Sequence, residues 1–231
     1  MSPKVWSTFS AGNGDKLRIL EAPADLVDEA LNFYIDHYLA AEPITNAAGV
    51  PKSKEAMAEY RSFTSEEFKG LNELSVLLCG MDNGDDKVGD IIGVSLFSVT
   101  NADQPFDMKF KPKTKELQKL MEIWGCMMTK YDVFKDQKVN KSMDCMGMTV
   151  LPKYNGSGIE EEFLKASRLL CKEKGAEVTS AWLTTSEPQT AAERVGYETV
   201  AEVSFEELGK QSGVTFENAP KMCKLMIAKP L

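Results

Sequence analysis

The segment at residues 151–163, LPKYNGSGIEEEF, decides between three structures for the middle of this chain. Asn155-Gly156 is a frequent dipeptide in β-hairpin turns, Asn155-Gly156-Ser157 matches the sequon for N-glycosylation, and Gly156-Ser157-Gly158 suits a loop that binds phosphate at the start of a helix. A hairpin needs strands on both sides, but the apolar residues after Gly158 have helical spacing. The hairpin is therefore excluded, and the rest of the chain must decide between the other two.

The composition is typical of a soluble globular protein in a reducing compartment. Of the 231 residues, 43% are hydrophobic and 27% are charged. The five cysteines are odd in number and lack CxxC or Cys/His spacing, which argues against a disulfide framework and against a zinc site, so we expect no metal. The N-terminus lacks a signal sequence, and no run approaches the roughly 18 apolar residues that span a bilayer. We therefore expect a cytoplasmic protein in which the sequon is not used.

The net charge of −8 argues against a nucleic-acid-binding protein, which would present a basic surface, and suits a cationic small molecule. We accordingly expect no nucleic-acid or membrane partner, and a monomer or weak dimer. The sequence has no repeat, low-complexity tract or long linker. This indicates a single domain over residues 1–231, with its core at about 17–229.

Hydrophobic periodicity predicts an α+β protein with strands at both ends of the chain. The runs at 74–80 and 88–100 should be antiparallel neighbours, because the MDNGDD segment between them is a hairpin turn. The predicted strands cover residues 16–21, 74–80, 88–100, 142–150, 177–185, 197–205 and 222–229. The predicted helices run from Pro23 to the residues before Pro43, over 54–68, over 114–134 with a break near Gly125, over 158–174 before Gly175, and over 189–194.

A strand that ends in a glycine-rich bend and continues into a helix presents backbone N–H groups to an anion, and pyrophosphate is the expected guest. The chain has neither GxGxxG nor GxxxxGK[ST], which excludes the common dinucleotide and P-loop motifs. What remains is KxxGxG, from Lys153 to Gly158. Taken alone, this motif is equally typical of an ordinary junction between a strand and a helix.

The surrounding segment at 143–200 carries a longer pattern: a strand, KxxGxG, a helix, another strand, and a short helix that closes with Gly196-Tyr197. It resembles the acetyl-CoA-binding core of the Gcn5-related N-acetyltransferase superfamily. More narrowly, the chain resembles the insect arylalkylamine (dopamine-type) N-acetyltransferases over residues 17–229. The features that carry this resemblance are Ala41-Glu42-Pro43-Ile44, Gly93, Tyr154, Gly158-Ile159 and the tail VTFENAPKMCKLMIAK.

The resemblance implies an α/β sandwich whose mixed, mostly antiparallel seven-stranded sheet is splayed centrally and flanked by helices. Acetyl-CoA, the co-substrate, would lie in the splay after Val150. Lys153 stands where the superfamily usually has arginine or glutamine, and Asn155 where the insect-type proteins often have arginine, so phosphate affinity would be reduced. The implied CoA-binding residues are Met148, Thr149, Val150, Lys153, Tyr154, Asn155, Gly156, Ser157, Gly158 and Ile159.

The reaction needs a base, because a primary amine with a pKa of about 10 is mostly protonated at neutral pH. The resemblance places the catalytic glutamate at Glu42, where Pro43 would hold its backbone at a helix end. Read without the resemblance, Glu42 is a solvated loop glutamate. His37, the only histidine, lies on an apolar helical stripe, where a structural role is expected. Without a nucleophile paired to a base, direct transfer to the amine is expected rather than a covalent acyl-enzyme.

A hydroxyl near the departing thiolate would complete the site. Insect-type relatives carry two serines four positions apart here, and counting back from Gly196-Tyr197 places Thr184 at the first and Pro188 at the second. Pro188 has no hydroxyl, so Ser186 is the possible substitute. An equally good alternative is that Thr185 or Ser186 caps a helix. Lys221 stands where some relatives have histidine.

The function implied is acetyl transfer from acetyl-CoA to a small primary amine, for example tyramine, dopamine, octopamine or serotonin. An alternative is a polyamine or agmatine acetyltransferase, which the acidic composition favours. A second alternative is a non-catalytic acyl-CoA-binding module, which Pro188 and the altered loop favour.

Overall fold

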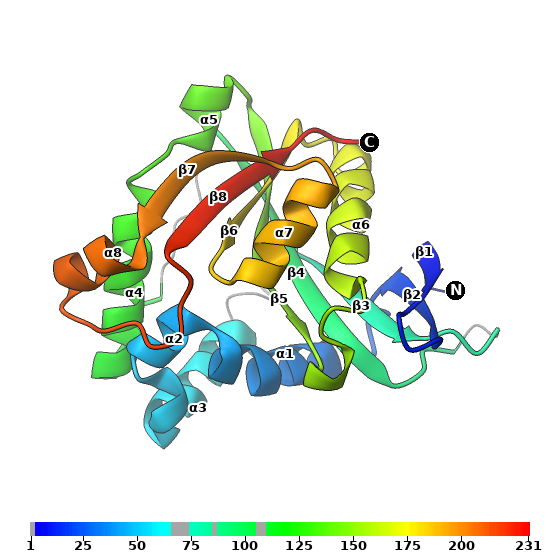
Figure 1. Cartoon of the computed structure of the whole chain (residues 1–231), viewed down its shortest axis with the longest axis horizontal. Coiled ribbons are helices and arrows are strands. Elements are labelled where there is room, and N and C mark those ends of the chain that lie inside the picture. The colour runs from blue at the N-terminus through cyan, green and yellow to red at the C-terminus, as the bar shows by residue number, and fades with distance from the viewer. Residues whose placement is uncertain (1–2, 66–73, 85–86, 105–109) are drawn as a thin grey trace.

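The computed structural model describes residues 3–65, 74–84, 87–104 and 110–231. These residues form one eight-stranded sheet with the order β1-β2-β3-β4-β5-β6-β8-β7 (Figure 1). All neighbouring strands are antiparallel except β5 and β6, which are parallel, so the sheet is mixed and mostly antiparallel, as expected. The strands are β1 (Val5–Ser10), β2 (Lys16–Glu21), β3 (Leu74–Met81), β4 (Ile91–Asn101), β5 (Lys141–Val150), β6 (Val178–Leu183), β7 (Glu198–Ser204) and β8 (Met222–Ala228).

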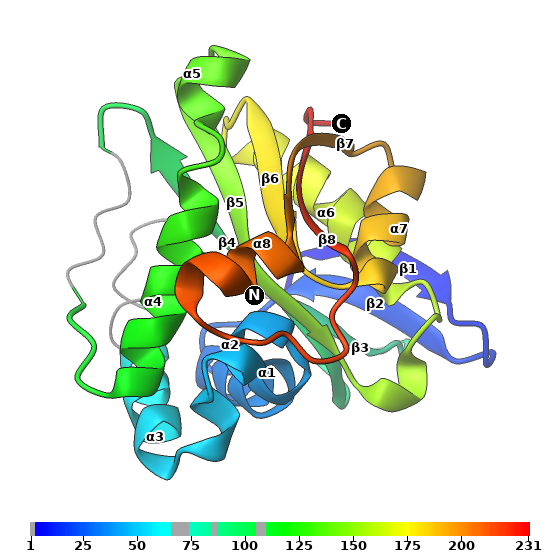
Figure 2. The same cartoon turned by 60° about the vertical axis from the view of Figure 1, so that its left-hand side comes forward.

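Helices cover both faces of the sheet, because alternate strand residues point to opposite sides. In β3, Val76 and Leu78 pack in the core beneath α1, whereas Leu77 and Cys79 pack beneath α6. Figure 2 shows α4 and α8 on the side of the sheet opposite α6. The helices are α1 (Val27–Ala41), α2 (Pro43–Ala47), α3 (Lys54–Phe63), α4 (Lys115–Met128), α5 (Val133–Gln137), α6 (Ile159–Glu173), α7 (Ser186–Arg194) and α8 (Phe205–Ser212), with 3₁₀ turns η1 (Val50–Lys52) and η3 (Pro152–Tyr154).

The sheet is splayed between β5 and β6. The two strands pair only from Ser142 to Cys145 on β5, whereas β5 continues beside β4 as far as Val150. The β4–β5 ladder shifts register between Leu96 and Phe97, opposite the point where β6 leaves. The last residues of β5 therefore present one backbone edge that β6 does not cover.

The sheet contains one strand more than the seven expected. The additional strand, β1, pairs with β2 through a short turn in which the N–H of Gly14 donates to the carbonyl of Ala11 at 2.9 Å. The α8 helix, whose N-cap Ser204 accepts from the N–H of Glu207 at 3.1 Å, was also not predicted. Short elements such as these are stabilised by packing against the sheet rather than by a long periodic pattern.

The predicted break near Gly125 is wrong, because α4 continues through this glycine and ends at Met128. A helical glycine costs about 1 kcal/mol relative to alanine, and the buried face of α4 outweighs that cost. The α7 helix begins at Ser186 rather than at 189, α1 begins at Val27 rather than Pro23, and β4 begins at Ile91 rather than 88. The end of the helix predicted at 54–68 lies partly outside the described residues.

Among the described residues, the structure has no helix with the length and apolar character required to cross a membrane.

Candidate active site

Glu42 lies at the junction of two helices. Its N–H donates to the carbonyl of Tyr38 at 3.0 Å and closes α1, while its Oε2 accepts from the N–H of Thr45 at 2.7 Å and caps α2. Pro43 explains the junction, because proline cannot continue α1 but suits the first position of a new helix. The Glu-Pro dipeptide therefore fixes the backbone from which the carboxylate projects.

Glu42 is 5% exposed, so it is not a solvated loop residue. Burial raises the pKa of its carboxyl group, and the N–H groups of Thr45 and Ile44 oppose that rise. Oε1 has no hydrogen-bond partner within the described part of the chain. One carboxylate oxygen is therefore held by the backbone of α2, while the other is buried without a hydrogen-bond partner in the described structure.

Thr184, which follows β6, reaches this carboxylate from the far side of the splay. The Thr184 hydroxyl is close enough to lower the pKa of the Glu42 carboxyl group. The two side chains nevertheless do not form a regular hydrogen bond. Cys223 on β8 also lies near Glu42, since the Glu42 charge adds to the effect of burial in raising the pKa of its thiol. The structure thus brings together two predicted catalytic residues that are far apart in the sequence.

Tyrosines surround the carboxylate on the side of α1 and α3. The rings of Tyr34 and Tyr38 stack with their centroids 4.6 Å apart, and Tyr60 is 1% exposed. Burial raises the pKa values of these phenols, and the charge of Glu42 raises those of Tyr38 and Tyr60 further. All of them therefore stay protonated at neutral pH.

The other predicted hydroxyls lie elsewhere. Ser186 is exposed at the start of α7, where its carbonyl accepts from Thr190 Oγ1 at 3.0 Å. Thr185 occupies the N-cap position of α7, but its side chain makes no capping hydrogen bond. Pro188 is in the first turn of α7, where the missing N–H costs nothing. Lys221 is exposed in the segment before β8.

The thiols and the histidine have structural surroundings. Burial raises the pKa values of Cys145 and Cys171 to about 11, so both thiols are neutral. His37 packs against the ring of Phe33 at a centroid distance of 4.5 Å. His37 is half-buried on α1, and Cys171 is buried.

The uncovered edge of β5 can bind an extended ligand. The N–H of Leu151 donates to the carbonyl of Ile92 on β4 at 2.9 Å. Because backbone groups alternate along an antiparallel strand, those of Val150 and Met148 point away from β4, into the splay. Thr149 between them is buried, with 7% exposure.

The loop after β5 offers fewer N–H groups than expected. The N–H groups of Tyr154, Asn155 and Ser157 donate to carbonyls within the loop. Those of Gly156, Gly158 and Ile159 have no backbone partner among the described residues, and they are the ones available to an anion. The six residues from Tyr154 to Ile159, all predicted to bind CoA, therefore differ in whether their N–H groups are free.

Both loop glycines have positive φ, 73° for Gly156 and 87° for Gly158, which favours glycine over other residues. A Cβ at either position would meet nothing within 4 Å, so the space outside the loop is open. The side chain of Tyr154 points inward instead, and its hydroxyl donates to Asp15 Oδ2 at 2.8 Å. Lys153 Nζ lies 5.1 Å from the centroid of the Tyr154 ring.

A hollow of about 330 Å³ lies between this loop, the first turn of α6 and α7, which are side by side in Figure 1. Its walls include Gly156, Gly158, Ser186 and Arg194. Sequence reasoning named Ser186 on α7 but missed the other α7 residues on this wall, Glu187, Thr190, Ala191 and Arg194. The signal was the spacing of Ser186, Thr190 and Arg194, which places them on one helical face.

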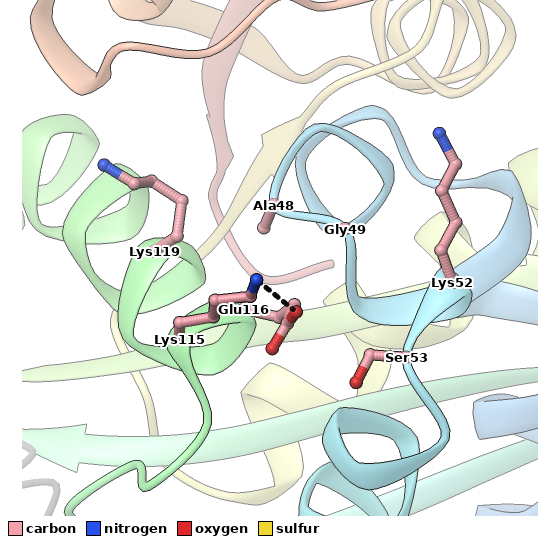
Figure 3. A pocket seen from close by; sticks show the side chains of 7 residues that line it. All are labelled: Ala48, Gly49, Lys52, Ser53, Lys115, Glu116 and Lys119. Carbon is pink, nitrogen blue, oxygen red and sulfur yellow. Dashed lines mark ion pairs between the residues drawn. The ribbon is translucent and has the colours of Figure 1, made fainter.

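A second hollow, of about 380 Å³, lies between the end of α2 and the start of α4 (Figure 3). Lys119 on its wall donates to Glu122 Oε2 at 2.6 Å and to the carbonyl of Ser212 at 2.8 Å. The side chain of Lys115 is 91% exposed and lies 4.0 Å from Glu116. None of the predicted site residues lines this hollow, which is therefore not the candidate active site.

The fold is similar to that of solved acetyltransferase structures. A putative arylalkylamine N-acetyltransferase 7 from the yellow fever mosquito Aedes aegypti superposes with a TM-score of 0.81 at 23% identity, covering 98% of this chain and 95% of that one. Arylalkylamine N-acetyltransferase 2 from Aedes aegypti gives 0.71 at 16% identity, covering 92% and 98%. The polyamine N-acetyltransferase of Drosophila melanogaster, which forms N-acetylagmatine, gives 0.69 at 12% identity, covering 92% and 99%.

No protein-family model matches the sequence, and no curated protein matches it. The structural similarity shows that the chain has the Gcn5-related N-acetyltransferase fold, an α+β sandwich with a mixed sheet flanked by helices. The fold implied by the sequence resemblance is therefore confirmed.

Proposed function

We propose that this protein transfers an acetyl group from acetyl-CoA to a small primary amine. The observation that carries the proposal is the buried carboxylate of Glu42, which has one oxygen without a partner in the described structure and lies across the splay from Thr184. A buried carboxyl group with a raised pKa is a candidate general base.

The raised pKa of Glu42 suits its task. A base works best when its pKa lies near the operating pH, and an ordinary exposed glutamate is too weak a base for an ammonium ion of pKa about 10. Thr45 holds Oε2, so Oε1 accepts the amine proton directly or through water. The neutral nitrogen then attacks the thioester carbonyl carbon, a C–N bond forms, and the C–S bond breaks with its electron pair leaving on sulfur.

The proton balance requires a donor for the departing thiolate. The ammonium ion loses two protons on the way to the amide. Glu42 takes the first and is regenerated when it releases that proton to solvent. The second proton leaves the nitrogen after attack and is transferred to the thiolate, which gives free CoA. Thr184, on the opposite side of the carboxylate, is the nearest predicted hydroxyl that can pass it on. Direct attack is favoured over a cysteine intermediate, since the Cys145 thiol is neutral.

The residues present fit CoA. The thioester supplies the activated acetyl group, and the backbone groups of Met148 and Val150 are oriented to bind the pantetheine arm. The N–H groups of Gly156, Gly158 and Ile159 would bind the pyrophosphate at the start of α6. No covalent attachment to the protein is required.

The tyrosines beside Glu42 favour an arylalkylamine as acceptor, because aromatic faces attract both cations and aromatic rings. A polyamine or agmatine is the second candidate, supported by the net charge of −8. A non-catalytic acyl-CoA-binding module is the third, supported by the absence of a hydroxyl at Pro188.

The test is thiol release from acetyl-CoA with tyramine, dopamine, octopamine, serotonin, agmatine and a polyamine. Wild type is compared with Glu42→Gln and with Glu116→Gln, a control glutamate whose side chain is 18% exposed and lies at the second hollow. We expect turnover that is lost in Glu42→Gln and retained in the control. Unchanged turnover in Glu42→Gln would remove Glu42 as the base, and CoA binding without turnover of any amine would favour the binding module.

A further inference from the structure

The hollow beside the glycine loop contains an ion pair that joins two helices. Arg194, the last residue of α7, donates from Nη1 to Glu161 Oε1 at 3.0 Å. Glu161 is in the first turn of α6, next to the N–H groups that the loop leaves available. Both side chains line the hollow, and they are 67% and 26% exposed.

The charges around this hollow oppose an anion. Of the described residues that line it, Glu160, Glu161 and Glu187 are acidic, and Arg194 is the one cation. The carboxylates crowd one another: besides burial, the charges of Glu187 and Glu161 raise the pKa of Glu160. A phosphate at the N-terminus of α6 would meet these carboxylates at the same place as the favourable N–H groups.

The loop lysine does not compensate for them. Lys153 is exposed and lies over the ring of Tyr154, and it is not on the wall of the hollow. Arg194 is therefore the cation, among the described residues, that lines the hollow beside the glycine loop. A guanidinium group can bind two phosphate oxygens at once, which a lysine cannot do.

We propose that Arg194 binds a phosphate of CoA and that Glu161 competes with this phosphate for the same guanidinium group. The proposal rests on the proposed function, because it assumes CoA in the splay. In the described structure Glu161 takes the place of the phosphate, and binding of CoA exchanges one anionic partner of Arg194 for another. The exchange is easy because an exposed ion pair is weak.

The framework of α7 keeps the arginine in place for this exchange. Gln189 Nε2 donates to the carbonyls of Leu183 and Met222, both at 2.9 Å, and so joins α7 to β6 and β8. The exposed Glu193, which precedes Arg194 on α7, serves as comparison: its Oε1 accepts from Lys224 Nζ at 3.1 Å, and it does not line the hollow.

The test is calorimetric binding of CoA, dephospho-CoA and pantetheine to wild type, Arg194→Gln, Glu161→Gln and the control Glu193→Gln. We expect Arg194→Gln to weaken CoA binding about tenfold or more, since a charge-assisted hydrogen bond is lost. Glu161→Gln should increase the affinity for CoA severalfold. The increase should be smaller in a protein that also carries Arg194→Gln. Pantetheine, which lacks the 3′-phosphate and the pyrophosphate, should bind all four proteins equally.

The control variant tests whether the effect is specific to Arg194, and dephospho-CoA tests which phosphate the arginine binds. Glu193→Gln should bind CoA like wild type. If Arg194→Gln leaves the affinity for dephospho-CoA unchanged, the arginine binds the 3′-phosphate. If the substitution still weakens the binding of dephospho-CoA, the arginine binds the pyrophosphate. Equal CoA affinities of wild type and Arg194→Gln would overturn the inference and leave the proposed function standing. Failure of wild type to bind CoA would overturn both.

Discussion

The hydroxyl of Tyr34 occupies the space that a side chain at Gly147 would need. A Cβ built on Gly147 would lie 2.1 Å from Tyr34 Oη and 2.8 Å from two ring carbons, and the hydroxyl donates to the carbonyl of Met146 at 3.2 Å. Gly147 lies just beyond the point where β5 separates from β6. Tyr34, Tyr38 and Glu42 are spaced four residues apart along α1 and its end, so one helical stripe connects the opening of the sheet with the candidate base.

Gly147→Ala should lower the free energy of unfolding by about 2–4 kcal/mol, because a buried ring must move and the φ of 152° is unfavourable for alanine. Chemical denaturation measures the change. Gly125→Ala is the matched control: its Cβ would meet nothing within 4 Å, and helix propensity predicts stabilisation of up to about 1 kcal/mol. If the two variants unfold alike, Tyr34 does not restrict the position of Gly147.

Glu42→Gln should separate stability from activity. The pKa of Glu42 is higher in the folded state than in the unfolded state. Between these two pKa values the folded state therefore binds more protons, and the free energy of unfolding falls as the pH rises. Glutamine avoids this penalty and can still accept from Thr45. We therefore expect the variant to be more stable than wild type at pH 7, with the difference vanishing near pH 4, and its kcat to fall about 10²–10⁴-fold.

The comparison uses thermal denaturation of both proteins from pH 4 to 8. Asp144 also has a pKa raised by burial, but it is common to both proteins and cancels in the difference. A variant that is less stable than wild type at pH 7 would contradict the account of the buried charge.

Thr184→Val should move the acidic limb of the pH–rate profile to higher pH. The hydroxyl lowers the pKa of Glu42, so its removal raises that pKa, and the base becomes ionised only at higher pH. Profiles of kcat/KM for wild type, Thr184→Val and Thr184→Ser measure the shift, and serine should restore the wild-type limb. Thr185→Val serves as control, because Thr185 makes no capping hydrogen bond, and an equal shift in that variant would count against a specific role for Thr184.

Tyr154→Phe should raise the KM for acetyl-CoA severalfold and leave kcat nearly unchanged. The hydroxyl of Tyr154 joins the glycine loop to Asp15 in the turn between β1 and β2, so its loss loosens the N–H groups that would bind phosphate. Tyr197→Phe, whose hydroxyl is 2.6 Å from that of Ser167 and remote from the loop, is the control in the same steady-state assay. An altered kcat with an unchanged KM would argue against this role of Tyr154.

Local sequence signals predicted much of the fold. Gly175 ends α6 with a φ of 66°, and the N–H of Ala176 donates back to Cys171 at 3.0 Å, as a C-terminal glycine predicts. The strands β3 and β4 pair as expected from the turn between them. The helix break predicted at Gly125 was wrong because the free-energy cost of a helical glycine is local. The burial of one face of α4, which outweighs this cost, depends on the rest of the protein.

The sequence by itself determined the glycine bend that opens α6 and the proline that turns the chain at Glu42, because both depend on backbone dihedral angles within a few residues. Only the tertiary structure decided that Glu42 is buried, that Thr184 faces it and that Arg194 is held by Glu161. Burial, pKa and pairing depend on residues far apart in the sequence, and they exist only once the sheet has brought those residues together.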